Sequence, residues 1–147
     1  KMKFDDLPYS LTVKGVNLCL TNSCKPINLL FSTGKMNNET IEYVLNWLEN
    51  NMSGPNILVG HYPLIEDHPI MRFRHKLWGH KQILAALKSK RIDLSLCGHV
   101  HHPHARLDKN GRGEIIIGSL TRNGCFALIE YDEKKDLFKY NKINVDD

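Results

Sequence analysis

The chain has 147 residues, enough for one domain with a single core, and its 41% hydrophobic and 24% charged residues are ordinary for a soluble globular protein. It contains no apolar run of about 20 residues, which excludes a transmembrane helix. The net charge of +4 is mild and the basic residues are scattered, so nucleic-acid binding is not indicated.

The first predicted elements are two short strands. Apolar and polar side chains alternate with period two in Ser10–Lys14 and in Val16–Leu20, and the two segments meet at Gly15. The polar stretch that follows, Asn22–Lys35, is predicted to be a loop.

A helix is predicted next. Asn37 or Asn38 is a suitable N-cap, and the helical spacing of apolar residues continues to about Met52, before a Gly-Pro pair that stops the helix. The face expected to be buried consists of Ile41, Val44, Leu45, Leu48 and Met52.

Two apolar strands then end in the same dipeptide. Ile57–Val59 is followed by Gly60-His61, and Ile92–Leu96 leads to Gly98-His99, with a predicted helix over Gly79–Lys90 between them. Helices between apolar strands indicate parallel pairing and an α/β fold. Because the carboxyl ends of parallel strands share one edge of a sheet, we expect the two histidines to lie on the same edge.

The last part of the chain has a different pattern, with short alternating strands separated by turn residues. It predicts an antiparallel β-meander. Its strands are His104–Leu107, Glu114–Gly118, Gly124–Tyr131 and Leu137–Asn144.

Histidine is unusually clustered, since all eight histidines lie between His61 and His104. A glycine before a strand-end histidine lets the backbone approach a metal ion closely, and neutral imidazole is a good ligand for first-row divalent metals. In His99-Val100-His101 the two imidazoles are expected to point the same way in an extended segment. The sequence therefore predicts metal ligands at His61, His99 and His101.

The four cysteines form no C-x-x-C pair and no zinc-ribbon spacing. Cys19, Cys97 and Cys125 lie in or at the ends of apolar strands, which predicts buried free thiols rather than a disulfide framework. Free thiols are typical of a reducing compartment, and we expect a cytoplasmic protein.

Two segments carry a resemblance to a known family. Ile57–Leu64, with Gly60-His61-Tyr62-Pro63, resembles the fourth metal motif of calcineurin-like metallophosphoesterases, and Asp93–Pro103, with Gly98-His99-Val100-His101, resembles the fifth. Ile117–Leu120 is similar to the Gly-Ser segment that follows the fifth motif, so the resemblance covers the chain from about Tyr9 onward.

The resemblance implies the C-terminal half of a four-layer αββα sandwich, with residues 1–147 as a single partial domain. It implies that His61 and His99 ligate one divalent metal ion and that His101 ligates a second, the metal being Mn, Fe or Zn. The implied activity is hydrolysis of phosphomonoester or phosphodiester bonds at this dinuclear centre.

Three other motifs of that family, Asp-x-His, Gly-Asp-x-x-Asp and Gly-Asn-His-Asp or -Glu, do not occur in the sequence. Three neutral imidazoles do not offset the charge of two divalent ions, so carboxylates are also required. Asp67 matches no motif and is interpreted as a loop carboxylate. We therefore expect a missing N-terminal half of the domain as a partner, and no catalytic residue or general acid is assigned within this chain.

Candidate substrate-binding residues lie outside the metal motifs. In the family the connection that here spans Ile65–Trp78 commonly borders the substrate pocket, so Arg72 and Arg74 are candidates for bidentate contacts with a phosphate. His102, beside His101, is a third candidate.

Two alternatives to an enzyme with part of its site in this chain remain open at this point. One is a catalytically inactive binding or scaffold module that keeps the phosphoesterase fold. The other is one half of an enzyme made of two chains, since unpaired sheet edges favour association.

Overall fold

The computed structural model describes residues 6–23, 32–51, 53–65 and 76–145. The strands are β1 (Tyr9–Val13), β2 (Val16–Leu20), β3 (Gly34–Lys35), β4 (Asn56–Val59), β5 (Leu77–Trp78), β6 (Leu94–Cys97), β7 (His104–Leu107), β8 (Gly113–Ile116), β9 (Cys125–Asp132) and β10 (Leu137–Asn144). The helices are α1 (Asn38–Asn50), α3 (Lys81–Lys88) and α4 (Leu120–Asn123).

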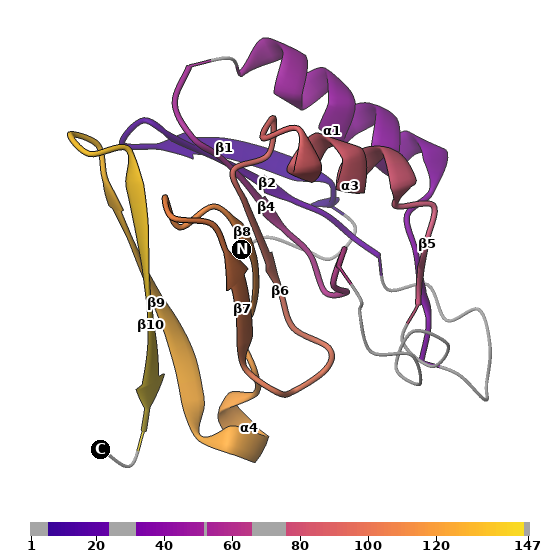
Figure 1. Cartoon of the computed structure of the whole chain (residues 1–147). Helices are drawn as coiled ribbons and strands as arrows, with labels where there is room; N and C mark the ends of the chain where they lie inside the picture. Colours follow the sequence, from indigo (N-terminus) through magenta and orange to yellow (C-terminus); the bar gives the residue numbers. More distant parts are fainter. Residues whose placement is uncertain (1–5, 24–31, 52, 66–75, 146–147) are drawn as a thin grey trace.

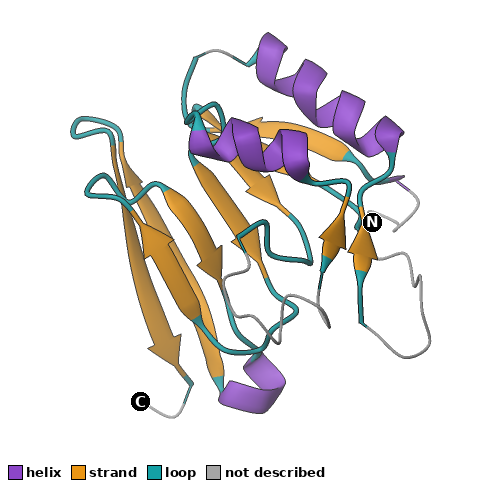
Figure 2. Ribbon diagram, turned by 45° about the vertical axis from the view of Figure 1, so that its right-hand side comes forward, coloured by secondary structure: helices purple, strands orange, loops and turns teal. Residues whose placement is uncertain are grey.

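A six-stranded sheet with the order β1-β2-β4-β6-β8-β7 lies between two layers. Figures 1 and 2 show α1 and α3 side by side over one face of this sheet. On that face, Cys19 and Leu58 of the sheet belong to the same hydrophobic cluster as the buried side chains of both helices. On the opposite face, Ile57 and Leu94 join Phe138 of the β9–β10 hairpin in a second cluster. The α/β class is therefore confirmed, with helices, sheet and hairpin as successive layers.

The predicted N-terminal strands form a hairpin. β1 pairs with β2 in antiparallel register, with Val13 opposite Val16. Both turn residues between them have positive φ, 48° at Lys14 and 81° at Gly15, which is the backbone of a type I′ turn. The right-handed twist of this turn matches that of the two strands it joins.

The centre of the sheet is parallel, as the sequence predicts. β2 pairs with β4, β4 with β6, and β6 with β8, all in parallel register. Successive residues of β4 face opposite sides of the sheet, so Leu58 contacts the helix layer while Ile57 and Val59 contact the hairpin layer. A strand that is buried on both faces needs an apolar run, which explains the sequence of β4.

The helices begin and end close to the predicted residues. The side-chain oxygen of Asn37 accepts a hydrogen bond from Thr40 N at 2.9 Å, which makes Asn37 the N-cap of α1. Met52, predicted near the end of this helix, lies outside the described residues. The buried apolar residues of α1 are Ile41, Val44, Trp47 and Leu48, with Leu45 partly buried.

The C-terminal strands do not form the single meander that their spacing suggests. β8 lies between β6 and β7, parallel to the first and antiparallel to the second. β9 pairs with β10 in a separate sheet, and the short helix α4 precedes β9. Glu114, Ile115 and Ile116 of β8 are all buried, which suits an interior strand rather than a half-exposed one. Local alternation predicts each strand but not its partner.

The described cysteines behave as predicted. Cys19, Cys97 and Cys125 are buried free thiols. Burial raises the pKa of the Cys19 thiol to about 12, so this thiol stays protonated and unreactive near neutral pH. Within the described part of the chain, no helix combines the length and the apolar character that crossing a membrane requires.

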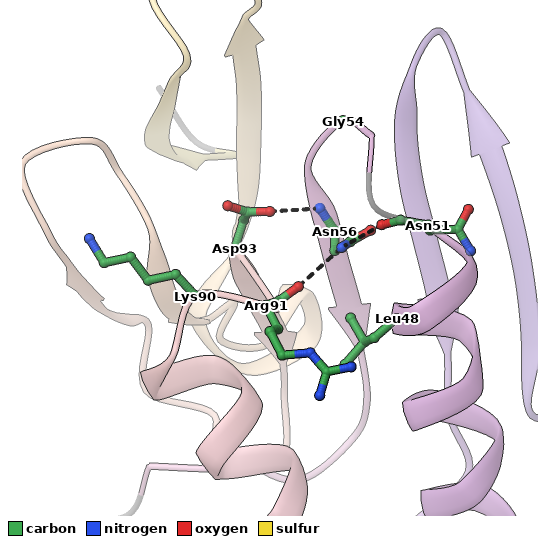
Figure 3. A pocket seen from close by; sticks show the side chains of 7 residues that line it. All are labelled: Leu48, Asn51, Gly54, Asn56, Lys90, Arg91 and Asp93. Carbon is green, nitrogen blue, oxygen red and sulfur yellow. Dashed lines mark hydrogen bonds between the residues drawn. The ribbon is translucent and has the colours of Figure 1, made fainter.

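A polar network joins the amino ends of the parallel strands. Figure 3 shows Asp93, which precedes β6, accepting a hydrogen bond from the backbone nitrogen of Asn56 at the start of β4, at 2.8 Å. The side chain of Asn56 in turn donates to the carbonyl oxygens of Asn51 and Arg91, both at 3.1 Å. These groups line a pocket at the sheet edge opposite the Gly-His dipeptides.

Arg112 extends this network to the hairpin layer. Its Nε donates to Asp93 Oδ1 at 2.6 Å, and one terminal nitrogen donates to the carboxylate of Asp136, in the turn between β9 and β10. Tyr131 also donates to Asp136, at 2.9 Å. The hydrogen bonds with Asp136 and Asp93 raise the pKa of Arg112 above its usual value. One guanidinium therefore ties the large sheet to the β9–β10 hairpin.

Replacing this guanidinium is expected to destabilise the fold. In Arg112→Met the largely buried Asp93 loses its cationic partner, and the loss of a hydrogen bond to a charged group lowers the free energy of unfolding by about 1.5–3 kcal/mol. Urea unfolding of both proteins measures the difference. Lys90→Met, which removes the exposed pair of Lys90 with Asp108, is the matched control and costs at most about 1 kcal/mol. Equal losses in the two variants would contradict the role of Arg112.

Candidate metal centre

Two neighbouring strands end at histidines on the same edge of the large sheet. β4 and β6 are parallel neighbours, and Gly-His follows each of them. Backbone hydrogen bonds continue the pairing past the strand ends, from Gly60 N to Leu96 O at 3.0 Å and from Gly98 N to His61 O at 3.1 Å. The main chain therefore brings His61 and His99 to adjacent positions, which confirms the predicted shared edge.

The two imidazole rings contact each other directly. Nδ1 of His99 lies 3.1 Å from Nε2 of His61, so that one nitrogen donates a hydrogen bond and the other accepts it. The ring centroids are 4.9 Å apart and the ring planes are inclined by 75°. We call His61 and His99 the histidine pair.

Tyr62 supports the histidine pair from the protein interior. Its ring centroid lies 4.0 Å from that of His99 and 5.1 Å from that of His61, the second contact being edge-to-face. Tyr62 is itself buried and belongs to the helix-side cluster. A Cβ atom at Gly34 would overlap the Tyr62 ring, so glycine at this position leaves room for that ring. The orientation of both imidazoles therefore depends on a packed aromatic side chain.

The backbone at the second Gly-His is held in an unusual conformation. His99 has φ of 64° and His101 has φ of 61°, both in the left-handed region that non-glycine residues seldom adopt. Such conformations cost about 1–3 kcal/mol each and are concentrated at functional sites. Val100 N donates to Gly98 O at 2.8 Å, which closes the turn around His99. The segment is therefore a tight turn and not the extended strand assumed for His99-Val100-His101.

His101 lies near enough to the histidine pair for its charge to act on His61. Desolvation lowers the pKa of His61 below its usual value, and the charge of His101 lowers it further. Among the described residues, no group of three or more His, Cys, Asp or Glu side chains is arranged to hold a metal ion. The assignment of His101 as a ligand stays a prediction.

The donor geometry of the histidine pair suits two ligands of one ion. Two nitrogens that each lie about 2.0–2.1 Å from a metal are roughly 2.9–3.4 Å apart when the angle at the metal is about 90–109°. The observed separation of 3.1 Å falls within this range. By spacing alone the two nitrogens could serve one divalent ion, and no carboxylate among the described residues is grouped with them.

The predicted substrate-binding arginines stay a prediction, because Arg72 and Arg74 lie outside the described residues, as does Asp67. His102 is exposed on the turn between β6 and β7. Its role stays a prediction.

Glu114 is a buried carboxylate that the sequence patterns do not predict. This side chain on β8 has only 2% of its surface exposed, and its carboxylate accepts hydrogen bonds from the backbone nitrogens of Leu64 and Ile65 at 2.7 and 2.8 Å. Desolvation raises its pKa, and these N–H groups oppose that shift. The sequence does contain a signal for this residue, because Glu114 directly precedes the apolar residues Ile115–Ile117 of a predicted strand. A glutamate is rarely buried unless partners bind its carboxylate.

Comparisons with known proteins agree with this fold. The family described as calcineurin-like phosphoesterase matches residues 2–103. A crystal structure of a protein from Staphylococcus aureus described as a 5′-nucleotidase, in complex with alpha-ketoglutarate, is similar with a TM-score of 0.51 and 17% sequence identity. The similarity covers 93% of this chain but only 29% of that one. No curated protein sequence matches the chain.

Because the backbone at His99 is left-handed, we expect the glycine variant at this position to be more stable than the alanine variant, the reverse of the usual order. His99→Gly and His99→Ala both remove the imidazole, but only alanine keeps a Cβ that is strained at positive φ. We expect His99→Gly to exceed His99→Ala in free energy of unfolding by about 1 kcal/mol. Chemical denaturation of the two variants measures the difference.

His102 provides the control for this comparison, because its φ is not positive. There the glycine variant is expected to be less stable than the alanine variant by about 0.4–1 kcal/mol. If the glycine variant were less stable than the alanine variant at both His99 and His102, strain in the backbone at His99 would be disproved.

Proposed function

Because the chain belongs to the calcineurin-like phosphoesterase family, we propose that it forms part of a metal-dependent hydrolase of phosphomonoester or phosphodiester bonds. The histidine pair is the observation that carries this proposal. Its nitrogens are 3.1 Å apart at the carboxyl edge of a parallel sheet, where α/β proteins place their functional residues. The family match supports phosphoesterase chemistry in general, and the choice between the two bond types belongs to the proposal.

In the proposed site, His61 and His99 hold one divalent ion and His101 contributes to a second. Mn, Fe and Zn all accept imidazole nitrogen beside carboxylate oxygen. Such ions polarise a phosphate oxygen and lower the pKa of bound water. The protein's own contribution is orientation, because Tyr62 packs against both rings of the pair and limits their rotation.

We also propose that the chain supplies only the imidazole side of the site. Two divalent ions require negative ligands, and the described residues offer no carboxylate grouped with the histidines. This chain covers only 29% of the similar S. aureus chain. The partner that fits both observations is a further, N-terminal part of the same domain, on the same polypeptide or on a separate one.

We propose a phosphate ester as the substrate, without a narrower class. Arg72, Arg74 and His102 are the candidates for contact with the phosphate group. The 5′-nucleotidase description belongs to the S. aureus protein, and at 17% identity that comparison shows the fold alone. Buried free thiols fit a reducing compartment, and we propose the cytoplasm.

Metal binding by the histidine pair is the direct test. We expect the 147-residue chain to bind Zn²⁺ in calorimetric titration, and His61→Ala and His99→Ala each to lower that affinity at least about tenfold, because each removes a nitrogen donor. Titration with Co²⁺ gives an independent reading, since its visible absorption reports the ligand set.

His104→Ala is the matched control, because His104 is an exposed imidazole on β7 and is not part of the proposed site. It is expected to leave the affinity for Zn²⁺ unchanged. Absence of Zn²⁺ and Co²⁺ binding by the chain together with the N-terminal part that supplies the carboxylates, or equal losses in all three variants, would contradict the proposed metal centre. That result would favour a scaffold module with the phosphoesterase fold.

A further inference from the structure

Two side chains on neighbouring strands hold one short segment of the main chain. Glu114 on β8 and Arg106 on β7 are directly opposite each other in the antiparallel register. Glu114 accepts hydrogen bonds from the backbone nitrogens of Leu64 and Ile65, and Arg106 donates from a terminal nitrogen to Ile65 O at 2.7 Å. Both backbone polar groups of Ile65 are therefore bound by this cross-strand pair.

The burial of Glu114 needs such partners. A buried carboxylate is costly unless its oxygens accept hydrogen bonds, and here two backbone nitrogens and the hydroxyl of Ser95 donate to it. Ser95 is also buried, and its hydroxyl lies 3.2 Å from Oε2. An apolar side chain at this position would leave the nitrogens of Leu64 and Ile65 without this acceptor.

The segment held in this way begins at the histidine pair. Leu64 is three residues after His61, and the residues between them are Tyr62 and Pro63, both buried. Tyr62 and Leu64 both belong to the helix-side cluster. The path from His61 to Ile65 is thus held at both ends. Gly98 N donates a hydrogen bond to His61 O at the start, and Glu114 accepts hydrogen bonds from the backbone nitrogens at the end. Between them, the buried side chains of Tyr62 and Leu64 pack into the helix-side cluster.

We propose that Glu114, assisted by Arg106, is a positioning residue that fixes the His61–Ile65 segment so that His61 Nε2 faces His99 Nδ1. Glu114 acts through the main chain and contacts neither imidazole. As far as it concerns metal binding, the inference rests on the proposed function. The geometry of the histidine pair itself does not depend on that function.

Glutamine is the sharpest substitution. Glu114→Gln keeps the size of the side chain but replaces one acceptor oxygen with an NH₂ group, which faces a backbone N–H donor. We expect the ring ¹⁵N signals of His61 in the metal-free 147-residue chain to shift and to lose the pattern of two imidazoles sharing a hydrogen bond. Long-range ¹H–¹⁵N NMR at constant pH measures this change.

A stability control separates positioning from general loosening. Phe138→Leu removes volume from the hairpin-side cluster and leaves all contacts of Leu64 and Ile65 in place. Its His61 signals are expected to match those of the unmodified chain, although its unfolding midpoint falls. Positioning by Glu114 is refuted when Glu114→Gln moves the His61 signals no more than Phe138→Leu does.

Arg106→Met provides a second, milder variant in case Glu114→Gln does not fold. Methionine keeps the apolar stem of the half-buried arginine and removes the guanidinium, including the donor to Ile65 O and the positive charge that acts on Glu114. The expected shift of the His61 signals is smaller but in the same direction. A folded Arg106→Met chain with unchanged His61 signals would count against the assisting role of Arg106.

Zn²⁺ titration links the inference to the proposed function. Loss of a group that orients a metal ligand typically lowers affinity 10–100-fold, and we expect Glu114→Gln to show a loss in this range while Phe138→Leu shows none. If Zn²⁺ is not bound even when the N-terminal part that supplies the carboxylates is present, the proposed function fails, whereas the NMR comparison still decides whether Glu114 positions His61.

Discussion

The arrangement of the site depends on the parallel pairing of β4 with β6 and on its continuation beyond the strand ends. Gly60 N donates to Leu96 O, and Gly98 N donates to His61 O, so backbone hydrogen bonds still join the two chains where the side chains change from apolar to imidazole. His61 and His99, each the second residue after its strand, are thereby brought close together. The 3.1 Å contact between the histidines lies just beyond these hydrogen bonds and is supported by the packing of Tyr62.

Two polar side chains connect the large sheet to the layers that cover it. At the amino ends, Arg112 pairs with Asp93 and connects the large sheet to the hairpin layer. On the helix-facing side of β8, Glu114 accepts hydrogen bonds from the backbone nitrogens of Leu64 and Ile65. These residues lie in a loop that packs beside the helices over the sheet. A buried loop has no ladder partners for its N–H groups, so a carboxylate at this point supplies the acceptors that a helix would have provided internally.

The sequence predicts what local patterns determine, and misses what depends on distant partners. The apolar run of β4 and the two Gly-His dipeptides are local, and they were enough to predict parallel strands and a shared edge for the histidines. Glu114 bonds to residues 49 and 50 positions away, and no local pattern names such partners. The position of β8 beside β6 is non-local in the same way, so the series after His104 was predicted as a meander of sequential neighbours.

The turn that contains His99 and His101 has a strained backbone but is held by several contacts. Positive φ at His99 and His101 is unfavourable for both residues, and the fold keeps this conformation although neither side chain is buried in the core. A relaxed, extended turn would carry His99 away from His61 and break the contact of its ring with Tyr62. The strain is balanced by the backbone pairing of Gly98 and by that stacking contact. The position of the imidazoles is therefore set by the fold itself, through the backbone pairing of Gly98 and the contacts of both rings with Tyr62.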